Sequence, residues 1–410
     1  MKRFLCAVFA FIFLLYFSVV GYADQSNILG ENAVNDGAES AVSAKGTKTN
    51  TIPFEIDAKS VILVEVSSGR VLFEKNADEK LYPASITKIM TMLLVAEAID
   101  SAKISLEDKV STSANAASKG GSQIWLKEGE IMTVHELLKA VAIGSANDAA
   151  TALGEYVSGS ETAFVGAMNA RAKELNMVNS HFDNATGLDD TSDTHLTTAR
   201  DIAIMSRELL KHKFIEEYTT VWMDSLRNGE TELVNTNKLV RFYNGTTGLK
   251  TGTTGKAGHC ISASARREGL HLIAVVLGSD NGTKRFEAAK AMLTWGFSNY
   301  MLLQPELSPN QITSVDIFYG EMCSVTPEMP RVEPILVLRG KEKDVTSEIE
   351  IIENVEAPVE EGQTLGTLKF ISDGEVVAEY NLTSPVAVKR LSFFLACSRI
   401  IRFLATGEVN

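Results

Sequence analysis

The stretch PASITKIMTMLLVAEAI, residues 83–99, organises the rest of the chain. From Ile86 to Ile99 it is apolar on nearly every side, which predicts a helix buried at the centre of a domain. Ser85 then lies at the N-terminal end of this helix. Lys88 shares its face, because residues three apart are neighbours on a helix. A hydroxyl and an amine placed in this way could act as nucleophile and base. The alternative is an N-cap serine beside a solvated lysine.

A second polar cluster, Ser145-Ala-Asn147, follows the apolar run Val134–Ile143, which predicts another helix. A break between two helices is a place where polar groups can project into a cleft. Ser145 could relay a proton towards a leaving group, and Asn147 could hold a substrate amide. Taken alone, the same pattern is more commonly a helix cap.

A third cluster, Lys250-Thr-Gly-Thr253, lies on a predicted strand. Lys250 and the hydroxyls of Thr251 and Thr253 suit a carboxylate, while Gly252 would let the strand approach a ligand closely. The backbone N–H of Thr253 could complete an oxyanion hole with that of Ser85. An ordinary surface strand could show this pattern by itself, so the three clusters gain their meaning from occurring together and in this order.

The segments around these clusters predict an α+β domain at residues 53–303, with helices around an antiparallel sheet. Ser60–Val66 and Arg70–Lys75 are β-type runs that flank a Ser-Ser-Gly turn, which is typical of a hairpin. Further strands are expected at 247–253, 258–266 and 270–278, followed by a helix at 283–300. The polar segment 180–197 is expected to be a long surface loop that could cover a site.

Beyond this domain the pattern changes twice. Short β-type runs with turn residues between them predict a small all-β domain at residues 304–387. Residues 388–410 then form an amphipathic segment, with apolar side chains on one arc and Arg399 and Arg402 opposite. It is too short and too charged to span a bilayer, so a helix lying in the membrane surface is expected. The alternative is a helix packed on its own domain.

The first 23 residues have the layout of a secretory signal peptide. Lys2 and Arg3 precede the apolar run Phe4–Val20, and Gly21-Tyr-Ala23 supplies small residues before a cleavage site. The alternative is an uncleaved membrane anchor. Residues 24–52 lack an apolar period and are rich in small polar residues, which predicts a flexible linker. The mature protein is therefore expected outside the cytoplasm.

Net charge and the spacing of cysteines and histidines argue against a nucleic-acid partner and against metal sites. The net charge of −13 over 410 residues argues against a nucleic-acid partner, because phosphate neutralisation needs clustered cations. The four cysteines lack the CxxC spacing of a zinc ribbon. His181 and His195 flank carboxylates in the 180–197 segment, but their spacing is irregular. We therefore expect both histidines to be solvated loop residues, and we expect the protein to use neither a metal nor a cofactor.

Taken together, these features resemble the D-alanyl-D-alanine carboxypeptidases of the low-molecular-mass penicillin-binding family. The resemblance covers nearly the whole chain and includes the SxxK, SxN and KTG elements. Further matching stretches are Tyr82-Pro-Ala-Ser-Ile-Thr-Lys88, Asn184-Ala-Thr-Gly-Leu-Asp189, Thr198-Ala-Arg-Asp201, Gly248-Leu-Lys-Thr-Gly252 and Leu293-Thr-Trp-Gly-Phe297. The implied fold is a transpeptidase/β-lactamase-like catalytic domain.

The resemblance also implies residue roles. Ser85 is similar to the family's acyl-ester nucleophile, Lys88 to its proton acceptor, Ser145 to a further active-site hydroxyl and Lys250 to a substrate-binding residue. Arg285 matches an arginine that supports carboxylate recognition. Members often carry His after the KTG element, where this chain has Thr253.

The expected activity is removal of the terminal D-alanine from peptidoglycan pentapeptides, with β-lactams acylating Ser85. The enzyme is expected at the outer face of the cytoplasmic membrane. One alternative is a β-lactamase, although residues 184–193 contain Asp and no Glu that could serve deacylation. Another is a peptidoglycan-binding sensor that is acylated without turnover.

Overall fold

The structure is a computed structural model that describes residues 52–188, 193–306, 312–372 and 374–406. The predicted signal peptide at 1–23 lies outside the described residues. The same holds for all but the last residue of the predicted linker at 24–52. Both stay predictions.

A five-stranded antiparallel sheet with the order β2-β1-β9-β8-β7 forms the centre of the first domain. The predicted hairpin is confirmed by the β1–β2 pairing, and Glu268-Gly269 joins β8 to β9. The register of β7 on β8 sets Lys250 opposite Ser262 and Gly252 opposite Cys260. The strands are β1 (Ser60–Glu65), β2 (Val71–Lys75), β7 (Thr246–Thr254), β8 (Gly258–Arg267) and β9 (Leu270–Ser279).

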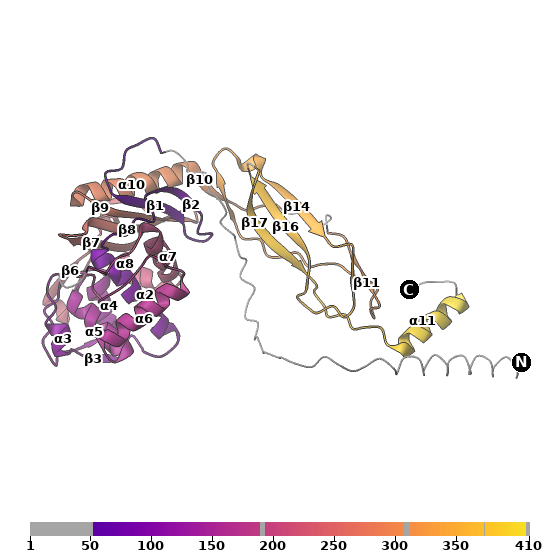
Figure 1. Cartoon of the computed structure of the whole chain (residues 1–410), viewed down its shortest axis with the longest axis horizontal. Helices are drawn as coiled ribbons and strands as arrows, with labels where there is room; N and C mark the ends of the chain where they lie inside the picture. Colours follow the sequence, from indigo (N-terminus) through magenta and orange to yellow (C-terminus); the bar gives the residue numbers. More distant parts are fainter. Residues whose placement is uncertain (1–51, 189–192, 307–311, 373, 407–410) are drawn as a thin grey trace, which may run out of the picture. The chain divides into compact units, whose positions relative to one another are not determined.

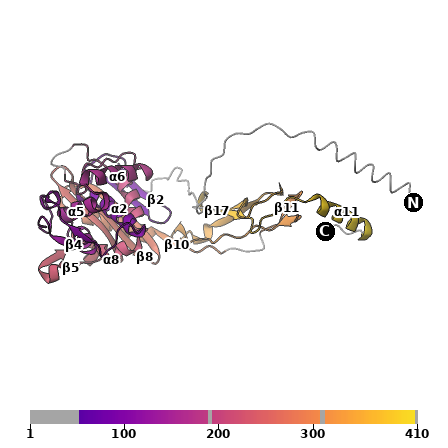
Figure 2. The same cartoon turned by 90° about the horizontal axis from the view of Figure 1, so that it is seen from below.

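Helices cover both faces of this sheet. In Figure 1, α10 lies along one face, and Figure 2 shows α2, α5 and α6 grouped together. The longer helices are α2 (Lys88–Asp100), α4 (Val134–Ala142), α5 (Asn147–Ser158), α6 (Glu161–Glu174), α7 (Ala199–Leu209) and α10 (Gly282–Asn299). Shorter elements are α3 (Ala114–Ala117), α8 (Glu216–Thr219), α9 (Leu239–Phe242), β3 (Lys109–Ser111), β4 (Ile131–Thr133), β5 (Met223–Leu226) and β6 (Thr231–Val234).

Strand β1 shows how the sequence divides the core into two layers. Its side chains alternate between the two faces of the sheet. Val61 and Leu63 pack in the layer under α10, whereas Ile62 and Val64 pack in the layer that contains α2. Helix α2 is apolar on nearly every side, most of its residues are buried, and Ile89 is fully buried. Each such side chain contributes about 1.5–3 kcal/mol by leaving water.

The following residues form a β-rich part, as predicted. Within the described residues of this part, the strands form three groups: β10 (Tyr300–Leu303) with β13 (Ile335–Leu338); β11 (Val315–Phe318) with β12 (Ser324–Val325) and β15 (Asn354–Glu356); and β14 (Thr346–Ile351) with β16 (Thr364–Ser372) and β17 (Glu375–Thr383). Along β16, Leu365 packs in one apolar cluster while Leu368 and Phe370 pack in another.

The predicted C-terminal helix is present as α11 (Phe393–Thr406), and none of its residues is buried. Its exposed apolar side chains are Phe393, Phe394, Leu395, Ile400, Ile401, Phe403 and Leu404. Across the described ranges no helix has the length and apolar character needed to cross a bilayer.

Candidate active site

Ser85 lies in a 3₁₀ turn, η1 (Ala84–Thr87), that leads directly into α2. The sequence predicted a helix that begins at Ile86 with Ser85 at its N-terminal end; in the structure the α-helix begins two residues later, at Lys88, and Ser85 lies in the 3₁₀ turn before it. The tighter turn strengthens the predicted pairing, since side chains three apart eclipse in a 3₁₀ helix. The Lys88 amine lies 2.9 Å from the Ser85 hydroxyl oxygen.

Lys88 is completely buried, which excludes the alternative of a solvated lysine. Its Nζ also contacts Asn147 Oδ1 at 2.5 Å and the Thr186 carbonyl at 2.8 Å. Burial lowers the pKa of Lys88 well below its usual range, the Lys250 charge lowers it further, and Asp148 acts in the opposite direction.

These contacts fix what a neutral Lys88 can do. A free amine has two N–H donors and one lone pair. Asn147 Oδ1 and the Thr186 carbonyl can only accept, so they take both donors. The lone pair is then left for the remaining neighbour, the O–H of Ser85. In its neutral form, Lys88 would therefore direct its lone pair at the Ser85 hydroxyl.

The second motif joins the site through Asn147. Ser145 is buried and has a left-handed backbone at φ 62°, at the break between α4 and α5. Asn147 accepts from Lys88 on one side and donates from Nδ2 to the Gly120 carbonyl at 2.6 Å on the other. Its predicted role in holding a substrate amide stays a prediction, since the amide bridges Lys88 to a neighbouring loop here.

The third motif lies on β7, the edge strand that packs against η1. A Cβ placed on Gly252 would lie 2.7 Å from the Pro83 carbonyl and 3.1 Å from the Ser85 nitrogen. Only glycine therefore allows this approach without displacing the turn that carries Ser85. The first and third motifs are therefore adjacent, whereas the predicted close approach of this strand to a ligand at Gly252 stays a prediction.

Lys250 is also fully buried, and its Nζ donates to the Thr251 carbonyl at 3.0 Å. Burial, and secondarily the charge of Arg285, lowers the pKa of Lys250 to about 7. Thr251 is buried and donates to the Thr236 hydroxyl at 2.8 Å, whereas Thr253 is exposed at the end of the motif. The motif thus combines a buried amine whose pKa lies near neutrality with an exposed hydroxyl at its end.

Arg285, near the start of α10, secures this end of β7. Its Nη1 donates to the Gly252 carbonyl at 2.8 Å, to Thr253 Oγ1 at 2.9 Å and to the Cys260 carbonyl at 3.2 Å. Among the described residues, Arg285 Nε is buried without a hydrogen-bond partner. The structure therefore places Arg285 beside the KTG motif, as the resemblance implied.

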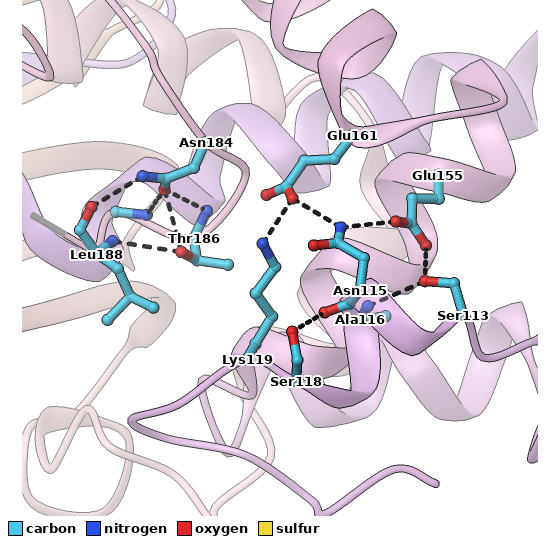
Figure 3. A network of polar contacts seen from close by, with 11 residues as sticks. Ser113, Asn115, Ala116, Ser118, Lys119, Glu155, Glu161, Asn184, Thr186 and Leu188 are labelled. Carbon is cyan, nitrogen blue, oxygen red and sulfur yellow. Dashed lines mark hydrogen bonds and ion pairs between the residues drawn. The ribbon is translucent and has the colours of Figure 1, made fainter. Parts of the chain in front are cut away.

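Residues 184–188 contribute a part of the site that the motifs did not reveal. Asn184 Oδ1 accepts from the Thr186 and Gly187 N–H groups, and its Nδ2 donates to the Leu188 carbonyl (Figure 3). This folds the segment so that the Thr186 carbonyl faces Lys88. The segment is tightly packed: a Cβ on Gly187 would lie 1.8 Å from the Ala84 carbonyl oxygen.

A second unforeseen part is the segment that carries Gly120. Lys119 forms an ion pair with Glu161 at 2.6 Å, and Asn115 donates to both Glu155 and Glu161 (Figure 3). The Ser122 carbonyl accepts from the Asn147 N–H at 2.7 Å. The acidic residues of α5 and α6 thus hold the loop against Asn147. The only sequence signal was a run of small turn residues.

The prediction of solvated loop histidines is wrong for His195, which is only 1% exposed. Its imidazole contacts Thr87 of η1, because the 194–197 segment packs inward instead of crossing the surface. His181 is exposed and lies 3.2 Å from Asp183. No group of side chains suited to a metal ion occurs in the parts of the chain that the structure describes.

Comparisons with known proteins agree with this geometry. A family model described as D-alanyl-D-alanine carboxypeptidase matches residues 45–281, and one described as the C-terminal domain of penicillin-binding protein 5 matches residues 308–390. The curated carboxypeptidase DacF of Bacillus subtilis is 43% identical over 95% of this chain and 94% of its own length. DacC of Escherichia coli is 35% identical over 83% and 86%, respectively.

Solved structures give the same result. Penicillin-binding protein 5 from Haemophilus influenzae is 29% identical, with a TM-score of 0.75 over 83% of this chain and all of its own. Penicillin-binding protein D2 from Listeria monocytogenes, solved in an ampicillin-bound form, is 31% identical, with a TM-score of 0.55 over 59% of this chain and 98% of its own. The chain belongs to the D-alanyl-D-alanine carboxypeptidase family, serine hydrolases of the low-molecular-mass penicillin-binding group.

Proposed function

We propose that this chain removes the terminal D-alanine from peptidoglycan stem pentapeptides through an acyl-ester on Ser85. The observation that carries the proposal is the buried Lys88 amine, 2.9 Å from the Ser85 hydroxyl with its other two contacts on carbonyl oxygens. This arrangement supplies a neutral base to an alcohol without any histidine.

In the first half of the reaction, Lys88 takes the Ser85 proton while the hydroxyl oxygen attacks the carbonyl carbon between the two terminal D-alanines. The backbone N–H groups of Ser85 and Thr253 are suited to the developing oxyanion, because β7 approaches η1 closely at Gly252. As the C–N bond breaks, the proton held by Lys88 passes to the D-alanine amine, with Ser145 as the proposed relay. In the second half, Lys88 takes a proton from the water that attacks the ester and returns it to the Ser85 oxygen as the ester C–O bond breaks.

The terminal carboxylate of the substrate is proposed to bind at the outer end of β7. Lys250 supplies positive charge there, and the hydroxyls of Thr251 and Thr253 supply short-range donors. Arg285 already holds the Gly252 carbonyl and the Thr253 hydroxyl, so it orients this end of the strand for the carboxylate. β-Lactams, which also carry a carboxylate beside a reactive acyl group, are proposed to acylate Ser85. The ampicillin-bound relative supports this.

The direct test combines labelling by a fluorescent penicillin with an assay of D-alanine release from a pentapeptide. Wild type should be labelled and should release D-alanine, whereas Ser85→Ala should do neither. Labelling of Ser85→Ala would refute the nucleophile. Rapid turnover of penicillin would indicate a β-lactamase, and stable labelling without D-alanine release would indicate a sensor.

We also propose that the protein is exported and attached to the outer face of the cytoplasmic membrane by α11. The support is the layout of residues 1–23 and the row of exposed Phe, Ile and Leu side chains on α11. A helix with these features is suited to lying in the lipid interface. Removal of residues 388–410 should move the active enzyme from the membrane to the soluble fraction. Unchanged membrane association would contradict the anchor.

A further inference from the structure

We infer that His195 is a positioning residue for acylation, which fixes the η1 turn through the Thr87 hydroxyl. The inference rests on the proposed function, because it assigns the role relative to Ser85 and Lys88. His195 Nε2 lies 2.8 Å from Thr87 Oγ1, although the two residues are 108 positions apart. Thr87 lies between the proposed nucleophile and base in the sequence, so a contact on its side chain acts on the turn that carries both.

The hydrogen bonds of His195 define its tautomer. The Asp183 N–H donates to His195 Nδ1 at 3.1 Å, so Nδ1 carries the lone pair. A neutral imidazole has one N–H, and it must then be at Nε2, which donates to Thr87 Oγ1. The ring therefore connects the start of the 183–188 segment to η1 with one acceptor and one donor.

Backbone hydrogen bonds on the C-terminal side of His195 hold the segment that carries it, and so they orient its side chain towards Thr87. The Leu81 N–H donates to the Thr197 carbonyl at 2.8 Å, and the Thr197 N–H donates to the Leu81 carbonyl at 3.0 Å. The His181 N–H donates to the Leu196 carbonyl at 2.8 Å. The imidazole packs edge-on against Phe182, with the ring centroids 5.7 Å apart. These contacts therefore fix the position of the His195 side chain relative to Thr87.

The Nδ1 side of the His195 ring contacts the segment that also reaches Lys88, the proposed base. Asp183 precedes Asn184, which folds the segment so that the Thr186 carbonyl reaches Lys88 at 2.8 Å. Gly187 contacts η1 so closely that an added Cβ would lie 2.7 Å from Thr87 Oγ1. His195 is therefore common to both supports of the Ser85–Lys88 pair: the turn that carries it and the segment that accepts from Lys88.

The experiment separates the two contacts of the ring. His195→Asn places a carbonyl oxygen near Nδ1 and keeps an acceptor for the Asp183 N–H, but it cannot reach Thr87. His195→Gln places an amide N–H near Nε2 and keeps the donor to Thr87. Thr87→Val removes the hydroxyl with little change of shape. The measurement is the acylation rate constant of Ser85 at saturating fluorescent penicillin, with the half-saturation concentration and the melting temperature recorded separately.

We expect His195→Asn and Thr87→Val each to lower the acylation rate constant roughly tenfold, with the half-saturation concentration unchanged. The double variant should be no slower than either single variant, because both changes remove one hydrogen bond. His195→Gln should restore most of the rate. If His195→Asn does not fold, Thr87→Val and Thr87→Ser still test the contact from the other side.

A matched control exists elsewhere in the domain. His271 is buried, and its Nε2 lies 2.8 Å from Thr247 Oγ1, so His271→Asn deletes a bond of the same kind and length. This variant should lower the melting temperature and leave the acylation rate constant unchanged. Equal loss of rate in His271→Asn and His195→Asn, additive losses in the double variant, or a wild-type rate in Thr87→Val would overturn the inference. Labelling of Ser85→Ala would instead refute the proposed function.

Discussion

Replacement of Gly187 by alanine should disable acylation while leaving the domain folded. Gly187 has φ +83°, and an added Cβ would lie 1.8 Å from the Ala84 carbonyl oxygen. Real Cβ atoms essentially never approach another heavy atom within 3.0 Å, so the segment and the turn must separate by at least 1.2 Å. The Thr186 carbonyl, one residue away, contacts Lys88 at only 2.8 Å.

A shift of this size is enough to break the contact between Thr186 and Lys88. The amine then loses one of the two acceptors that direct its lone pair at Ser85. Displacements of about 1 Å at a reacting pair cost roughly 10²-fold in rate, and we expect a loss of that order in acylation. The alanine also adds the cost of a left-handed backbone, about 1–2 kcal/mol in stability.

Gly159, at the C-terminus of α5, is the matched control. It has the same φ of +83°, but among the described residues no atom lies within 4 Å of an added Cβ. Gly159→Ala therefore carries the backbone cost without the collision. The assay is the rate of labelling by fluorescent penicillin, with melting temperatures measured in parallel. If Gly187→Ala is acylated as fast as Gly159→Ala, the Thr186 carbonyl does not direct the base, and the reasoning fails.

Three other changes test the remaining parts of the site. Lys88→Arg should reduce labelling of Ser85 by at least about 10³-fold, because a guanidinium stays protonated and cannot accept a proton; labelling at the wild-type rate would contradict the assignment of the base. Because the pKa of Lys250 is about 7 and its charged form exists below that value, kcat/KM for a carboxylate substrate should fall about tenfold per pH unit above 7. Lys250→Arg should remove this alkaline decrease in pH–rate profiles, and an unchanged profile would count against Lys250. Asp148 is fully buried and accepts from the backbone N–H groups of Ile124, Leu126 and Ala149, so Asp148→Asn should leave a buried donor unpaired and cost about 1–3 kcal/mol. Calorimetry should show a melting temperature lower by several degrees, and an unchanged value would show that the loop rearranges freely.

Much of the site could be predicted because its chemistry is local in the sequence. Ser85 and Lys88 are three residues apart, so helical periodicity alone predicted their contact. Gly252 was predicted to let the strand approach a ligand closely, whereas the structure shows a different close approach, to the Pro83 carbonyl. The hairpin of β1 and β2 was predicted from two β-type runs around a Ser-Ser-Gly turn, and β9 from a run that is apolar without interruption from Leu272 to Leu277.

The missing parts depend on groups that leave little trace in a sequence. The acceptors at Gly120 and Thr186 are backbone carbonyls, which every residue possesses. Thr186 also lies 98 positions from the amine that it contacts. His195 was misjudged because polar neighbours suggested solvent, whereas its partner on η1 is distant in the chain. A polar side chain can be buried when it has hydrogen-bond partners in the interior. When those partners are about 100 residues away in the sequence, only the tertiary fold brings them together.

Lys250 is only partly protonated near pH 7, and this should affect the heat that is measured when a ligand binds. With its pKa at about 7, this amine is largely neutral in a mildly alkaline solution. A ligand that presents a carboxylate favours the ammonium form, so binding at pH 8 draws protons from the solution. The heat released should therefore vary with the ionisation enthalpy of the buffer, and the slope of that dependence counts protons taken up per ligand, with an upper limit near one for this group.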